Sequence, residues 1–120
     1  MTNREKGDLG EDIAAEYLAR LGYEILERNY TGKGGEIDII AKDGDTLVFV
    51  EVKTRIGSDE PGAQAVDERK CAFLVNAAER FVLEKDETAA EMKARFDLVD
   101  ISFSKRTVSP DIRHCKNIIF

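Results

Sequence analysis

The chain has 120 residues and a net charge of −6; 42% of its residues are hydrophobic and 35% are charged. These values suit one domain over residues 1–120, exclude a disordered chain, and argue against a protein that coats nucleic acid through bulk positive charge. No apolar run reaches the roughly 18 residues that span a bilayer, so we expect no membrane partner.

The N-terminal residues 1–12 are polar and of mixed charge, so they show no signal peptide and we expect a cytoplasmic protein. The two cysteines, Cys71 and Cys115, lack CxxC spacing and are interpreted as small buried side chains rather than disulfide partners or zinc ligands. The one histidine, His114, is interpreted as incidental, which makes His-dependent triads poor candidates.

The first predicted element is an amphipathic helix over residues 8–21, where apolar side chains recur about every four positions. Gly22 is a plausible stop for this helix. A strand is predicted for residues 23–30, and a glycine-rich turn for residues 31–35.

The rest of the chain reads as two strands, a long amphipathic helix and two more strands. Their expected ranges are 36–42, 46–55, 64–84, 95–104 and 113–120. The order α-β-β-β-α-β-β predicts an α/β fold in which helices cover the faces of a mixed sheet.

The hairpin between residues 36 and 55 carries the strongest local chemical pattern. Because side chains alternate along a strand, a loop with an even number of residues puts Asp38 and Glu51 on the same side of the sheet. A turn at residues 44–45 would set them directly opposite, and a turn at residues 43–44 would shift them by one diagonal. A three-residue loop would separate them onto opposite faces.

The apolar residues of the hairpin favour the even loops. In those registers Ile37 and Ile39 lie on the same face as the valines at 48, 50 and 52, which predicts one dry side of the sheet.

The other side would hold Glu36, Asp38, Glu51 and Lys53. Carboxylates gathered on one face repel, and a bound Mg²⁺, which prefers oxygen ligands, would remove that cost. Lys53, about 7 Å along the strand from Glu51, could orient water or stabilise a phosphate during hydrolysis of a phosphodiester. The alternative interpretation is that these residues are solvated at a strand end.

Two helix residues lie where they could join this site. Lys70 falls inside the apolar stripe of the second predicted helix, where it either snorkels to solvent or points into a polar pocket under the helix. Glu11 lies at the edge of the apolar sector of the first predicted helix, a position where most glutamates are solvated.

Five segments resemble, in order, the blocks of the bacterial YraN-like family: GEDIAAEYLARLGYEILERNY, GGEIDIIAKDGDTLVFVEVKTR, AVDERK, RFDLVDI and HCKNIIF. That family is placed with the restriction-endonuclease-like, or PD-(D/E)XK, nucleases and is similar to archaeal Holliday-junction resolvases. Ile37 stands where restriction enzymes have a Pro before the first acid, as in the YraN-like pattern. Ile119 replaces the family's usual Ala.

The resemblance implies a restriction-endonuclease-like α/β fold, with a central mixed sheet flanked by helices. It also implies roles for residues at matching positions. Asp38 and Glu51 would bind Mg²⁺ or Mn²⁺, with Glu11 completing the metal site, and Lys53 would complete the catalytic set. Lys70 looks like the helix residue that follows the core motif in related nucleases.

The function so implied is a metal-dependent endonuclease that hydrolyses structured or branched DNA, with Lys53, Arg55 and Lys70 as the expected DNA contacts. The alternative is a non-catalytic nucleic-acid- or partner-binding module that keeps the fold. The intact set of Asp38, Glu51 and Lys53 favours the enzyme. The acidic net charge favours the module, or a narrow basic groove assembled by a homodimer. A small-molecule phosphoesterase is a third alternative, disfavoured because no phosphate-cradling loop is visible.

Overall fold

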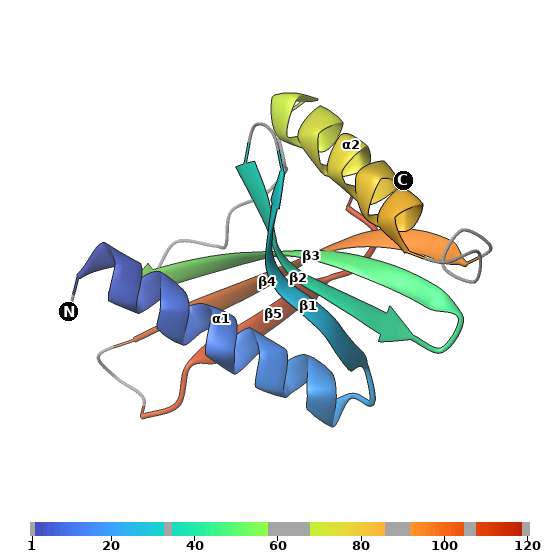
Figure 1. Cartoon of the computed structure of the whole chain (residues 1–120). Helices are drawn as coiled ribbons and strands as arrows, with labels where there is room; N and C mark the ends of the chain where they lie inside the picture. Colours follow the sequence, from blue (N-terminus) through green and yellow to red (C-terminus); the bar gives the residue numbers. More distant parts are fainter. Residues whose placement is uncertain (1, 33–34, 58–67, 86–91, 105–107, 119–120) are drawn as a thin grey trace.

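Seven elements form the protein in a computed structural model that describes residues 2–32, 35–57, 68–85, 92–104 and 108–118 (Figure 1). They are α1 (Asn3–Arg20), β1 (Glu24–Gly32), β2 (Gly35–Asp43), β3 (Thr46–Ile56), α2 (Glu68–Glu84), β4 (Lys93–Phe103) and β5 (Asp111–Cys115). The strands form one sheet in the order β1-β2-β3-β4-β5. Strands β3 and β4 run parallel and the other neighbours antiparallel, which confirms the predicted mixed sheet.

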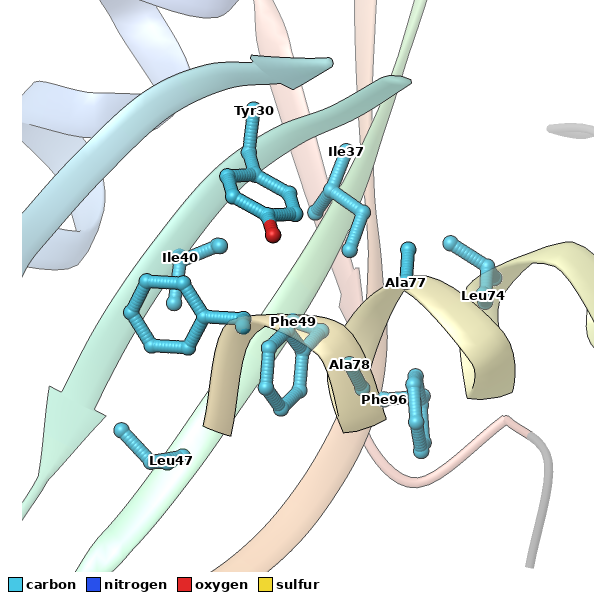
Figure 2. Close-up of a cluster of buried hydrophobic side chains, with 10 residues drawn as sticks. Tyr30, Ile37, Ile40, Leu47, Phe49, Leu74, Ala77, Ala78 and Phe96 are labelled. Carbon is cyan, nitrogen blue, oxygen red and sulfur yellow. The ribbon is translucent and has the colours of Figure 1, made fainter. Parts of the chain in front are cut away.

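Helices α1 and α2 cover opposite faces of the sheet, as Figure 1 shows. The core under α2 holds Phe49 between two other aromatic rings, Phe81 at 6.0 Å and Phe96 at 5.4 Å between centroids (Figure 2). The core under α1 is built mainly from Ile39, Val50 and their neighbours on β3 and β4. The α/β fold class, with helices flanking a central mixed sheet, is therefore confirmed.

The expectation of one dry side is wrong, because both faces of the central strands are buried. Ile37 and Ile39 were expected to share a face, yet Ile37 belongs to the core under α2 and Ile39 to the core under α1. The end of β2 that holds Ile37 rises toward α2 (Figure 1), where a Cβ on Gly35 would lie 3.3 Å from the Phe73 ring. Strict alternation therefore fails where this strand bends toward the helix.

The hairpin between β2 and β3 follows one of the predicted even registers. Asp43 pairs with Thr46 around a two-residue turn, and Gly44 takes the positive φ of 61° that such a turn requires. This is the turn at residues 44–45.

Helix α1 begins five residues before its predicted start. Thr2 and Glu5 form a capping box, in which the Thr2 hydroxyl accepts from the Glu5 N–H and the Glu5 carboxylate accepts from the Thr2 N–H, both at 3.1 Å. The capping box therefore extends ordered helix back to Asn3.

At the other end of the chain, β5 is shorter than the predicted strand over 113–120. Asn117 has a φ of 59°, and the Ile118 N–H donates to the Phe96 carbonyl at 2.7 Å, so the chain leaves the ladder after Cys115. Residues 64–67 of the second predicted helix, most of the predicted loop over 56–62, and residues 119–120 lie outside the described residues.

Candidate functional site

The candidate site lies where β2 separates from β3. The last paired residues in this direction are Ile39 and Val50, and the same register continued by one residue sets Asp38 opposite Glu51. Oδ2 of Asp38 accepts a hydrogen bond of 2.8 Å from the Val52 backbone N–H. The Asp38 side chain thus satisfies a backbone donor on β3 beyond the end of the ladder, which fixes the carboxylate at the strand edge.

A pocket of about 400 Å³ lies beside this edge, between β3 and the first half of α1. Glu11, Asp38 and Glu51 all line it, so the structure brings together the three acids that the sequence singled out. The close approach of α1 depends on Gly10, because a Cβ there would come within 1.8 Å of the Thr54 hydroxyl oxygen.

The electrostatics of the pocket disfavour three ionised carboxylates. Burial, together with the charges of Glu51 and Glu11, raises the pKa of Asp38 to about 7, and the Val52 N–H and Lys70 act in the opposite direction. Burial also raises the pKa of Glu11, an effect that the nearby Arg28 opposes. Such crowding of half-buried acids is typical of a cation-binding site, although structural clusters also show it.

The donor set fits a hard divalent cation. Mg²⁺ is usually held by one or two carboxylates together with water, and Asp38 and Glu51 supply two. Oε1 of Glu11 is buried and accepts no hydrogen bond from any described residue, and the buried Oε2 of Glu51 has an ion-pair partner, Lys70 Nζ at 3.3 Å. The described residues contain no set of three or more His, Cys, Asp or Glu side chains close enough together to hold a metal ion. The three acids therefore share one pocket without converging on one point.

Lys70 reaches the site from α2. Its Nζ lies 3.3 Å from Oε2 of Glu51 and 5.3 Å from the centroid of the Phe73 ring. Of the two interpretations left open for Lys70, this contact with Glu51 supports the one in which the side chain points into a polar pocket under the helix.

The other two expected DNA contacts are placed differently. Lys53 is exposed and does not line the pocket. Arg55 forms an ion pair of 3.3 Å with Asp100, whose side chain is 4% exposed. Of the three expected DNA contacts, Lys70 is thus placed against a residue of the pocket by its ion pair with Glu51.

Sequence reasoning missed two pocket residues, Asn3 and Lys6, which line the pocket from the first turns of α1. The signal for them was the Thr2-x-x-Glu5 capping box, which places the helix start early enough for Asn3 to share one helix face with Glu11.

The interpretation of His114 as incidental is wrong. Its Nε2 lies 2.8 Å from Oδ2 of the fully buried Asp97, and its Nδ1 lies 3.2 Å from the Tyr17 hydroxyl. Arg95 donates two further hydrogen bonds to Asp97, of 3.0 and 3.1 Å. His114 therefore belongs to a buried polar network under α1, away from the pocket. Cys71 and Cys115 form no disulfide within the described residues and are half-buried rather than buried.

A second cavity of about 470 Å³ lies between α2 and the sheet, lined by apolar side chains that include Phe49, Val82 and Phe96. Its one ionisable lining residue among those described is Glu79, so it lacks the groups that chemistry on a phosphate needs.

Neither helix in the described part of the chain has the length and apolarity to cross a membrane.

The amino-acid sequence matches a known protein family. A model of the uncharacterised protein family UPF0102 matches residues 10–101, a span that contains Glu11, Asp38, Glu51 and Lys70. This chain belongs to the UPF0102 family. The predicted membership of the YraN-like family is thereby confirmed.

Its UPF0102 relatives match over nearly the whole chain. The protein from Caldicellulosiruptor saccharolyticus is 43% identical over 98% of both chains. The proteins from Clostridium kluyveri and Geobacter metallireducens are 41% and 44% identical, each over 96% of this chain and 93% and 92% of their own. All three carry only the family name.

Among solved structures, the chain is similar to SfsA of Pyrococcus furiosus, solved in complex with Ca²⁺. The TM-score is 0.40 and the identity 15%, over 94% of this chain and 63% of that one.

Proposed function

We propose that this protein is a Mg²⁺- or Mn²⁺-dependent nuclease that hydrolyses phosphodiester bonds in structured or branched DNA. The observation that carries the proposal is the pocket at the parting of β2 and β3, which Glu11, Asp38 and Glu51 line together. Carboxylates from two strands and a helix at one sheet edge are a donor set suited to a divalent cation and a phosphate.

The acids of the pocket and Lys53 would have different roles in hydrolysis. Asp38, fixed by the Val52 N–H, and Glu51, contacted by Lys70, would hold the metal, and Glu11 would support it from α1. The metal would supply charge to polarise a phosphate oxygen and lower the pKa of a bound water. Hydrolysis adds that water across the ester bond, which gives a phosphate monoester and an alcohol. Lys53, exposed on β3, would contact the DNA or the developing charge.

The cleavage test uses linear, nicked, flapped and four-way DNA with Mg²⁺, Mn²⁺ or a chelator. We expect cleavage only with metal, lost about 100-fold or more in Asp38→Asn and Glu51→Gln. Glu16→Gln is the matched control, because Glu16 is an exposed α1 carboxylate outside the pocket. Cleavage that persists in both pocket variants would refute the assignment.

A second test measures metal binding without activity. A divalent ion that binds only the folded pocket stabilises it by about 2.7 kcal/mol at a hundred times its Kd. We expect Mn²⁺ to raise the Tm of the wild type and of Glu16→Gln, and to raise it much less in Asp38→Asn and Glu51→Gln. Equal shifts in all four proteins would contradict a metal site in the pocket.

The runner-up function is a non-catalytic module that binds nucleic acid or a protein partner. The observation that favours it is that the three acids line the pocket without forming a cluster of metal ligands within the described residues. Salt-dependent DNA binding without cleavage of any DNA in the panel, with or without metal, would support this alternative. The homodimer expected from the sequence stays a prediction, which light scattering can check.

A further inference from the structure

The pocket holds a lysine that the sequence motifs do not mark. Lys6 lines it from α1 together with Glu11, Asp38 and Glu51, and among the described residues it is the one basic residue that does so. Within those residues its ammonium forms neither a hydrogen bond nor an ion pair. Lys53, which the family resemblance marks as catalytic, is exposed and outside the lining.

We propose that Lys6 is the phosphate-binding lysine of this pocket and contacts a backbone phosphate of DNA beside the metal, the position otherwise expected for Lys53. The inference rests on the proposed nuclease function and adds a substrate-contacting residue to it. Lys70 cannot fill this place without leaving Oε2 of Glu51, which it contacts at 3.3 Å. Arg55 is likewise paired with the buried Asp100.

Local structure holds Lys6 in place. The capping box of Thr2 and Glu5 makes the preceding turn helical, so Lys6 stands on ordered helix rather than on a loose terminus. Gly10, one turn further on, lets the helix approach Thr54 closely. Lys6 is half-buried, as expected for a stem that lies along the pocket wall with its ammonium at the opening.

Charge gives Lys6 its role. With three carboxylates ionised, a divalent ion and the Lys70 ammonium on Glu51 balance the pocket, and Lys6 adds the positive charge that attracts an anionic phosphodiester. Without Lys6 the loaded pocket would carry no net charge to attract the phosphate.

Gly7 leaves the space that a phosphate would need. It lines the pocket next to Lys6, and a Cβ built on it meets no atom within 4 Å. A longer side chain at this position would fill the pocket without disturbing the core, which offers a second test that leaves every charge in place.

The test compares Lys6→Met with Lys53→Met in DNA affinity, measured by fluorescence anisotropy on four-way DNA with Ca²⁺ as the metal. We expect Lys6→Met to weaken binding about tenfold or more, Lys6→Arg to retain most of it, and Lys53→Met to lose less affinity than Lys6→Met. Lys93→Met, at an exposed lysine outside the pocket, is the control and should change binding less than about threefold. Gly7→Gln should also weaken binding. A Lys6→Met protein that binds as the wild type does, while Lys53→Met loses affinity, would overturn the proposal.

A titration with Mn²⁺ alone, followed by thermal shift, separates this proposal from the function on which it rests. If the Lys6 ammonium faces the carboxylates, its removal should tighten Mn²⁺ binding severalfold in Lys6→Met, whereas Lys93→Met should leave it unchanged. If the wild type binds no DNA, the nuclease proposal fails and the phosphate role of Lys6 fails with it. If Mn²⁺ affinity is the same in Lys6→Met and the wild type, Lys6 does not face the site, whatever the DNA result.

Discussion

Lys70 on α2 and Glu51 on β3 form an ion pair with Nζ 3.3 Å from Oε2, in which the two side chains are 34% and 15% exposed. The contact joins the helix on one face of the sheet to the acid at the strand edge. The Lys70 ammonium neutralises the Glu51 carboxylate, and a bound divalent metal would do the same. Lys70 and a bound metal therefore compete electrostatically for the same acid.

Replacing Lys70 by Met tests this relationship. Methionine keeps an apolar stem but removes the ammonium from both Glu51 and the Phe73 ring, so we expect the metal-free protein to lose about 1 kcal/mol of unfolding free energy. Because the competing ammonium is gone, the Mn²⁺-induced rise in Tm should be larger than in the wild type. A smaller rise would mean that Lys70 orients Glu51 for the metal rather than opposing it.

The raised pKa of Asp38 predicts how metal affinity depends on pH. With a pKa of about 7, Asp38 must lose its proton before it can bind a cation. We expect the affinity for Mn²⁺ to rise about tenfold per pH unit up to pH 7 and to level off above it, with release of one proton per ion at pH 6. Calorimetry in buffers of different ionisation enthalpy measures that proton, and Asp38→Asn should release none.

The same shift predicts the stability of the metal-free protein. Because the pKa of Asp38 is raised from 3.8 to about 7 on folding, the stability linked to its proton is fully present below pH 4 and is lost as the pH rises through 7. Urea unfolding should therefore show the wild type losing stability relative to Asp38→Asn between pH 5 and pH 8. A constant difference across that range would contradict the shift.

Two glycines on α1 form a matched pair for testing how the helix sits on the sheet. Gly10→Ala would force a Cβ to within 1.8 Å of the Thr54 hydroxyl, so we expect a loss of about 1–3 kcal/mol despite the better helix propensity of alanine. Gly7→Ala meets no atom within 4 Å and should gain up to about 1 kcal/mol. Thr54→Ala should restore part of the loss in Gly10→Ala. Chemical denaturation measures all four, and equal effects at the two glycines would rule out the close contact.

Among the polar residues that the structure describes, we expect Asp97 to contribute most to the free energy of unfolding. Burial raises its pKa, but hydrogen bonds from His114, Arg95 and the Asn117 N–H outweigh it and hold the pKa below its usual range. Asp97→Ala leaves the Arg95 charge without its main partner, so we expect a loss of about 3–5 kcal/mol. This contribution is present above pH 4 and is lost as the pH falls through the lowered pKa. His114→Gln should cost less, because Arg95 still pairs with Asp97; thermal unfolding ranks the two.

Much of the site could be predicted from local patterns. The turn signal at Gly44 predicted a hairpin that brings Asp38 and Glu51 to the same end of the two strands, because a two-residue turn fixes the register, and both acids line the pocket there. The apolar stripe of α2 placed Lys70 on the inward side of the helix but left open whether its side chain snorkels to solvent, because helical periodicity gives the side of a helix and not where a long side chain ends. Such features repeat every two or every three to four residues and need no knowledge of the rest of the chain.

Other contacts depend on the tertiary structure, because strand and helix periodicity does not determine them. The bend of β2 toward α2 puts Ile37 and Ile39 in different cores, because it depends on how the strand meets Phe73 of a helix more than thirty residues away in sequence. His114 meets Asp97 and Tyr17 only through the pairing of β5 with β4 and the packing of α1 over both. Lys6 enters the pocket only because Gly10 lets α1 approach Thr54. Each of these contacts is set by the stacking of layers, since residues distant in sequence leave no local pattern that could reveal them.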